Sequence, residues 1–173
     1  MIVRQERPED ERELAALIDA GFGDTSTSAF TAALRSSPGY VPEFTFVAED
    51  AGELVGVTML SYVRLDARRI LILTPMAVRP DRQRTGIGKT IVRAALAAAE
   101  ARGEPVVLVE GVPSYYPQFG FRSATELGIE KPHPGIPEAA WLAFPLAAYD
   151  PDLRGRVAYP PFFPPPPAAA LNT

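Results

Sequence analysis

The sequence predicts an α/β domain in which apolar strands alternate with amphipathic helices. Two β-branched and aromatic stretches, Phe44–Ala48 and Leu54–Leu65, flank the acidic turn EDAGE, which is typical of a β-hairpin. The apolar runs Arg69–Val78 and Pro105–Glu110 indicate two buried strands. A helical pattern separates these runs, so together they predict a strand–helix–strand crossover.

Three shorter elements are expected before the hairpin. Ile2–Glu6 favours a first strand. Pro8 then opens a helix that reaches about Ala20, because proline is tolerated in a first helical turn and acidic residues follow it. Thr25–Leu34 predicts a second helix, and the segment SSPGYVP after it predicts a loop.

The central crossover contains a proline and two informative glycines. Pro75 lies inside the strand Arg69–Val78 and cannot donate a ladder hydrogen bond, so that strand is expected to bulge or splay there. From Gly86 to about Ala101, apolar residues recur at helical spacing, and Gly103 stands where a C-terminal cap is expected.

The last third of the chain gives weaker signals. Ala139–Leu146 predicts a late strand. From Pro160 onward, six prolines fall within fourteen residues, a composition that favours an extended tail over a core element. The predicted organisation is one domain over residues 1–148, followed by a Pro-rich extension over residues 149–173.

Composition excludes several classes of function. The chain has 173 residues and a formal net charge of −4, so it offers no basic surface for nucleic acid. It has no cysteine, which rules out disulfides, zinc–thiolate sites and a cysteinyl intermediate. Its N-terminus is too charged for a signal peptide, and no apolar run has the roughly 18 residues that a membrane span needs. We therefore expect a cytoplasmic protein that does not bind membranes.

Hydrolytic and metal chemistry have little support. His133 is the single histidine, and it lies in the Pro-rich loop KPHPGIP. No Gly-x-Ser-x-Gly nucleophile motif exists to pair with it. Metal-ligating residues do not cluster either, so no metal is expected.

The segment RPDRQRTGIGKTIV, residues 79–92, is the strongest motif. Backbone N–H groups at a helix start bind anions, and glycines allow a close approach. An ATP phosphate loop would need glycine where Gln83 stands, and a dinucleotide fingerprint would need glycine where Ile91 stands. A plain turn before a helix and a cradle for the pyrophosphate of an acyl-coenzyme A remain the other interpretations.

Two motifs together resemble one family. Gln83-Arg84-Thr85-Gly86-Ile87-Gly88 follows an apolar strand that ends in Val78-Arg79-Pro80. The stretch VPSYYPQFGF follows the strand PVVLVEG and is similar to a Tyr-x-x-x-Gly-Phe signature. Both features resemble the GNAT family of acetyl-coenzyme A-dependent N-acetyltransferases, in particular a subgroup of small bacterial enzymes with a YYxxFGF turn. The resemblance covers roughly residues 1–148.

The resemblance implies a GNAT fold, which is a mixed, mostly antiparallel sheet with helices on both faces. The sheet would open into a V between the strands 69–78 and 105–110. The implied reaction is direct transfer of acetyl from acetyl-coenzyme A to a primary amine of a small molecule or peptide. A catalytically silent acyl-coenzyme A sensor is the alternative. A homodimer is compatible with the sequence.

The resemblance also assigns roles to individual residues. Tyr116 would protonate the leaving thiolate as general acid, whereas Tyr115 is interpreted as a packing residue. Glu110, and less strongly Glu49 and Glu53, are candidates for the base that deprotonates the amine. The backbone of the central strand would hold the pantetheine arm, and the loop would hold the pyrophosphate; the residues implied are Met76, Ala77, Val78, Gln83, Arg84, Thr85, Gly86, Ile87, Gly88 and Lys89.

Overall fold

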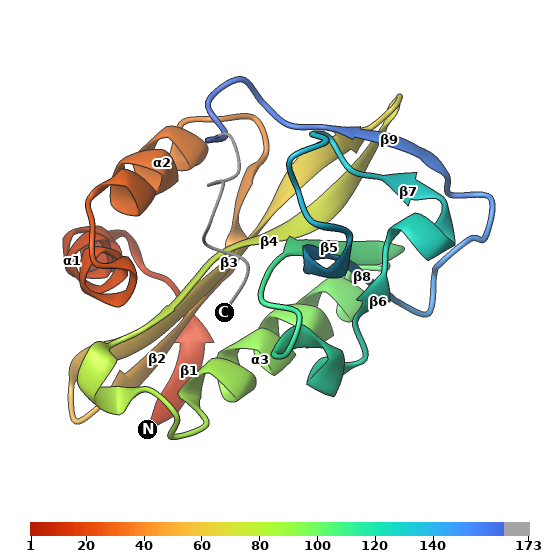
Figure 1. The fold of residues 1–173 in the computed structure, drawn as a ribbon. Helices are drawn as coiled ribbons and strands as arrows, with labels where there is room; N and C mark the ends of the chain where they lie inside the picture. The colour runs from red at the N-terminus through yellow and green to blue at the C-terminus, as the bar shows by residue number, and fades with distance from the viewer. Residues whose placement is uncertain (165–173) are drawn as a thin grey trace. The chain divides into compact units, whose positions relative to one another are not determined.

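A computed structural model describes residues 1–164 of the protein (Figure 1). The chain divides into two compact units, each of which we describe by itself. The first unit contains Met1–Ser61 and Thr74–Ala98, and the second contains Tyr62–Leu73 and the described residues from Ala99 onward. Two long strands contribute to both units: β3 (Glu53–Leu65) and β4 (Arg68–Val78).

In the first unit the strands follow the order β1-β2-β3-β4. Strand β1 (Ile2–Gln5) is antiparallel to β2 (Tyr40–Asp50), which is antiparallel to β3. The hairpin prediction is thus confirmed. The predicted loop SSPGYVP is partly wrong, because β2 begins at Tyr40, which pairs with Ser61 of β3. Pairing with a distant strand overrides the local turn signal.

Three helices belong to the first unit: α1 (Glu11–Phe22), α2 (Ser26–Arg35) and most of α3 (Ile87–Ala101). The predicted first helix begins with a 3₁₀ turn, η1 (Pro8–Asp10), before α1 starts. Helix α1 places Gly21 against Ala77 of β4, at 3.1 Å from the Ala77 Cβ for a methyl group built on the glycine. Figure 1 shows α1 and α2 side by side.

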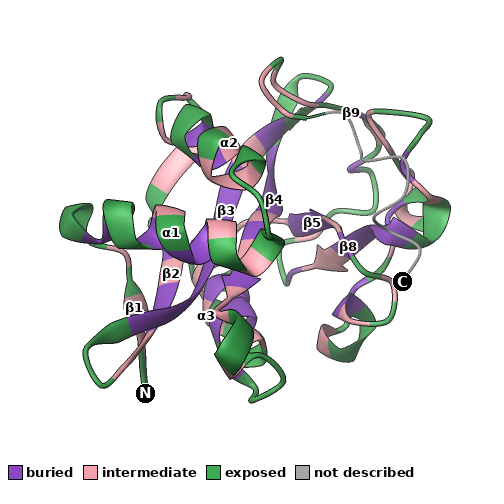
Figure 2. Ribbon diagram, turned by 60° about the vertical axis from the view of Figure 1, so that its left-hand side comes forward, coloured by how far each residue is buried: buried purple, intermediate pink, exposed green. Residues whose placement is uncertain are grey.

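Helix α3 lies on the opposite face of the same strands. Ile87 and Ile91 join a core cluster with Ala48 and Val55, against which Met76 and Val78 also pack. Because side chains alternate along a strand, Ala77 faces α1 while its two neighbours face α3. The strands between the helices are largely buried (Figure 2). Helices therefore cover both faces of the sheet in this unit, as predicted.

Gly56 of β3 sets how closely α3 approaches. A methyl group at this position would lie 2.8 Å from Ile87 Cγ2 and 3.4 Å from Ile91 Cδ1. We expect Gly56→Ala to destabilise the protein by about 1–3 kcal/mol, because overpacking a closed core forces neighbours to move. Thermal unfolding would then show a melting temperature lower by several degrees. Adding Ile87→Leu, which removes the β-branch, should restore part of the loss; no recovery would contradict this explanation.

In the second unit β3 is followed by β4, β5 (Val106–Glu110), β8 (Trp141–Pro145) and β6 (Arg122–Ser123). The pair β4–β5 is parallel, as a crossover requires, and the pairs β5–β8 and β6–β8 are antiparallel. The predicted mixed and mostly antiparallel sheet is confirmed. Among the described residues, the registered β4–β5 pairs run from Leu71↔Val107 to Leu73↔Val109. They end just before Pro75, where the sequence predicts the strands to part.

The segment after residue 148 contributes a strand that the sequence did not predict. Strand β9 (Gly155–Ala158) is antiparallel to β3 and parallel to the short β7 (Ile129–Glu130). Leu153 and Val157 are buried in the core of the second unit. The described part of the predicted extension therefore packs on this unit. The last prolines of the expected tail, within residues 165–173, lie outside the described residues.

Candidate functional site

The loop between β4 and α3 contains two residues with a positive φ. Gly86 has a φ of 92°, and Arg84 has a φ of 60°, which is unusual for a residue with a side chain. Thr85 closes the turn by donating its hydroxyl to the Arg82 carbonyl at 2.5 Å. The Gly86 carbonyl accepts the Thr90 N–H at 3.1 Å, so Gly86 caps the helix that begins at Ile87.

Side-chain contacts fix this loop to the first unit. Arg79 donates its N–H to the Val55 carbonyl at 3.0 Å and its guanidinium to Glu53 at 2.7 Å. Gln83 donates its amide to the Val78 carbonyl at 3.2 Å. At the C-terminal end of the loop, the Ile87 side chain packs over Gly56 of β3. The loop is thus held between β3, β4 and α3.

Arg82 and Arg84, two arginines of the loop, differ in whether their charge is already paired with a carboxylate of the protein. Arg82 forms an ion pair with Asp50, and this contact is the largest cause that holds the pKa of the Asp50 carboxyl below its usual value. The charge of Arg82 is therefore already neutralised by Asp50. Arg84 is exposed, and the described structure gives its side chain no hydrogen bond or ion pair. Arg84 is the better placed of the two to add charge to a bound anion.

The N–H groups from Arg84 to Lys89 form a continuous donor surface. In the part of the chain that the structure describes, none of them has a backbone acceptor, and the first donor of the helix ladder is Thr90. Gln83 through Gly86 and Lys89 are exposed, whereas Ile87 is buried as an anchor. Unpartnered donors at the positive end of a helix, here one of fifteen residues, are the arrangement that favours anion binding in proteins.

The strand end that leads into the loop belongs to the same unit. Met76 and Val78 are half-buried on the α3 face, and Ala77 is buried under α1. The structure therefore brings together all the cofactor-binding residues that the sequence analysis named. All of them lie within one continuous segment of the first unit, from Met76 to Lys89.

Tyr116 lies in the second unit and is buried, with 6% of its surface exposed. It begins the 3₁₀ turn η3 (Tyr116–Phe119), in which Pro117 occupies a first-turn position where proline is tolerated. Its ring makes edge contacts with Tyr115 at 5.2 Å and Phe121 at 5.4 Å between ring centroids. Burial raises the pKa of the Tyr116 phenol well above its usual range, so the group stays protonated at neutral pH.

A glycine makes room for this ring. A methyl group at Gly111 would overlap the Tyr116 ring, so only glycine fits there with the ring in this position. Gly111 donates its N–H to the Ala140 carbonyl at 3.0 Å, which holds the chain in line with the sheet after β5. At the other end of η3, Gly120 adopts a φ of 106° and ends the turn. The position of Tyr116 is therefore set by backbone that only glycine can supply.

Glu110, the last residue of β5, has a partner that sequence reasoning missed. Tyr159 donates its hydroxyl to the Glu110 carboxylate at 3.1 Å. Burial raises the pKa of Glu110, and the hydrogen bond from Tyr159 opposes that rise. Nothing in the sequence marks Tyr159, because it lies in the Pro-rich segment and its contact spans 49 positions.

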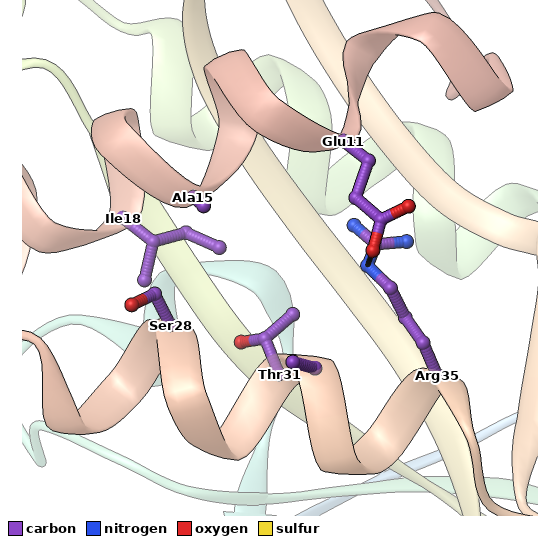
Figure 3. A pocket seen from close by; sticks show the side chains of 7 residues that line it. Glu11, Ala15, Ile18, Ser28, Thr31 and Arg35 are labelled. Carbon is purple, nitrogen blue, oxygen red and sulfur yellow. Dashed lines mark ion pairs between the residues drawn. The ribbon is translucent and has the colours of Figure 1, made fainter.

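A small pocket lies between α1 and α2 (Figure 3). Its volume is about 30 Å³, which holds about two water molecules. Arg35 and Glu11 both line it; the Arg35 guanidinium lies 4.0 Å from the Glu11 carboxylate and 2.7 Å from the Glu6 carboxylate. This pocket is far too small for a coenzyme.

Two features are absent from residues 1–164. No group of three or more His, Asp or Glu side chains there could hold a metal ion. None of the described helices is long and apolar enough to cross a membrane.

Comparison with known proteins agrees with the geometry. Residues 42–123 match the acetyltransferase (GNAT) domain family. A relative in Escherichia coli K12, the N-acetyltransferase YjhQ, is 28% identical over 156 residues, which is 86% of each chain.

Two solved structures share the fold at 25% identity. The GNAT family N-acetyltransferase YhbS of Escherichia coli, in complex with coenzyme A, has a TM-score of 0.85 over 93% of this chain and 90% of its own. A GNAT family acetyltransferase of Brucella melitensis, in complex with acetyl-coenzyme A, has a TM-score of 0.77 over 94% of this chain and 97% of its own. Residues 42–123 therefore match a GNAT acetyltransferase domain, and the chain is similar to GNAT family N-acetyltransferases over most of its length.

Proposed function

We propose that the protein transfers the acetyl group of acetyl-coenzyme A directly to a primary amine. The observation that carries this proposal is the run of unpartnered N–H groups from Arg84 to Lys89 at the start of α3. Phosphate groups are among the anions that bind to adjacent N–H donors at the positive end of a helix, and a diphosphate can use several of these donors at once. The two solved structures described above contain coenzyme A or acetyl-coenzyme A, which supports the same cofactor here.

Residues of both units have a part in the proposed reaction. The loop residues Gln83 to Lys89 hold the diphosphate, and the backbone of Met76 to Val78 holds the pantetheine arm. Backbone N–H groups beside the thioester stabilise the oxyanion that forms when the amine attacks. Tyr116 donates its proton to the departing thiolate. Its phenol is protonated at neutral pH, as a general acid must be before it donates.

The acceptor is a small molecule or peptide that presents a primary amine. The experiment is to measure thiol release from acetyl-coenzyme A across a panel of polyamines, amino acids, aminoglycosides and peptides with free N-termini. We expect release that depends on one class of amine. Binding without release, shown by a melting temperature raised by coenzyme A, would instead favour the silent sensor. A rise with ATP and none with coenzyme A would contradict the proposal.

A further inference from the structure

The tight turn between β2 and β3 carries two acidic residues in directly opposite positions. Asp50 and Glu53 are partners in the register of the two strands. Like charges placed in this way destabilise a strand pair. Between them, Ala51 has a φ of 53°, a left-handed conformation that strains a residue with a Cβ. The turn therefore contains two local conflicts, which contacts from elsewhere in the chain must offset.

Those contacts come from the loop between β4 and α3. Arg82 forms an ion pair with Asp50. Arg79 donates its guanidinium to Glu53 at 2.7 Å, and its backbone N–H donates to the Val55 carbonyl at 3.0 Å. One arginine of the loop thus reaches each of the two opposed carboxylates. The charges of the turn and of the loop are complementary, and all these residues belong to the first unit.

Arg82 is held by the protein at three of its groups. Its N–H donates to the Arg79 carbonyl at 2.9 Å, and its own carbonyl accepts the Thr85 hydroxyl at 2.5 Å. Its guanidinium contacts Asp50. Two residues later, Arg84 has a φ of 60°, a conformation that persists only where its surroundings hold it. In the described chain, the run of open N–H donors begins at that same residue.

We propose that Asp50 and Glu53 are positioning residues for coenzyme A, which act through Arg82 and Arg79. The inference rests on the proposed function, in which the N–H groups of the loop hold the diphosphate. Donors that are in place before a ligand arrives bind it more tightly, because binding then includes no cost of ordering them. The acidic turn holds the arginines, and the arginines hold the loop in the shape that presents its donors.

Simple electrostatics gives the opposite expectation, so the sign of one measured effect decides. A carboxylate near a bound diphosphate repels it, and removing that carboxylate would then strengthen binding. Once released from Asp50, Arg82 would also be free to pair with a phosphate group. If positioning dominates, the same substitution weakens binding, because the ligand must first order the loop.

The first test compares Asp50→Asn with Glu49→Gln by calorimetric titration with coenzyme A. Glu49 is the matched control, because it is the preceding residue and accepts a hydrogen bond from Arg4, at 2.8 Å, instead of from the loop. We expect Asp50→Asn to raise the Kd about fivefold, the scale of one exposed ion pair, and Glu49→Gln to leave it within about twofold. An unchanged or lower Kd in Asp50→Asn would overturn the proposal.

A double-mutant cycle tests whether Asp50 acts through Arg82. The Met1 ammonium also lies 3.1 Å from Asp50, so the loop contact has to be isolated from that contact. Arg82→Gln removes the loop partner alone, and we expect about the same fivefold loss. The double variant should lose no more than either single variant, because both changes remove one interaction. Asp50→Glu, which keeps the carboxylate, should recover most of the affinity. Losses that multiply in the double variant would contradict the proposed route.

Two measurements without coenzyme A separate positioning from a general loss of structure. The side chains of Asp50 and Arg82 are 28% and 33% exposed, so their pair adds little to stability, and the melting temperature of Asp50→Asn should stay within about 2 °C of the parent value. Trypsin should cleave after the exposed Arg84 about threefold faster in Asp50→Asn, because the loop opens more often. Glu49→Gln should be cleaved at the parent rate. Equal cleavage of all three proteins would overturn the positioning role.

Failure of this inference is distinguishable from failure of the proposed function. A parent protein that does not bind coenzyme A overturns the proposed function, and this inference with it. A parent protein that binds coenzyme A, together with an Asp50→Asn variant of equal affinity, overturns this inference alone. If Asp50→Asn does not fold, Arg82→Gln supplies the same comparisons of Kd and cleavage with Asp50 in place.

Discussion

Replacing Tyr116 by Phe is expected to lower kcat by about 10²–10⁴-fold while leaving KM for acetyl-coenzyme A within about threefold. The substitution removes one oxygen and keeps the ring, which is what contacts Tyr115 and Phe121. Without the hydroxyl, the thiolate must leave unprotonated or take a proton from water. Thiol release under saturating amine measures the loss.

The neighbouring tyrosine provides the matched control. Tyr115 is half-buried, and its ring meets Tyr116 and Phe119 at edge contacts. Tyr115→Phe removes the same atom one residue away, and we expect kcat to change less than threefold. A loss below threefold in Tyr116→Phe would contradict the general-acid role. Similar losses in both variants would show that the effect is structural.

The raised pKa of Tyr116 adds a prediction about pH. A general acid works only while it is protonated, and burial shifts the loss of its proton to higher pH. An exposed phenol would begin to limit the rate near its ordinary pKa of about 10. We therefore expect the parent enzyme to keep its kcat up to pH 10. An alkaline limb that begins near pH 9 and disappears in Tyr116→Phe would contradict this prediction.

Strands and helices whose signal lies within one short segment were predictable from the sequence. The apolar runs gave the strands β3, β4 and β5, and the helical spacing gave α3, with bounds close to those observed. Gly103 was predicted to stand at the C-terminal cap of this helix, and it follows α3 with a φ of 77°. In each case the information lies within about fifteen residues of chain.

Features that depend on distant partners were not predictable. Strands β6, β7 and β9 have two, two and four residues, and their signals are too short to stand out from loops. They form because other strands supply pairing partners. The left-handed Arg84 is a second case, because arginine gives no local reason for that conformation. The contact between Tyr159 and Glu110 is a third, since a Pro-rich segment does not indicate which side chain it buries.

The loop between β4 and α3, where we propose that the diphosphate binds, leads to the second large effect. Gly86→Glu is expected to raise the Kd for coenzyme A about 100-fold, equivalent to about 2.7 kcal/mol. Nothing lies within 4 Å of a Cβ built at this position, so the side chain meets no steric clash. Its carboxylate would lie at the positive end of α3, where it competes for the N–H donors and repels a diphosphate. Titration calorimetry with coenzyme A measures the change.

Two further variants separate charge from backbone strain. Gly103 also has a positive φ, of 77°, and open space around it, but it follows the opposite end of α3. Gly103→Glu should therefore leave the Kd within about twofold while imposing a similar strain.

Gly86→Gln keeps the shape and removes the charge, so its effect should be roughly tenfold smaller than that of Gly86→Glu at low salt. Because salt screens exposed charges, the gap between these two variants should narrow as ionic strength rises. Equal affinities for all three variants would mean that no diphosphate is held at this helix start.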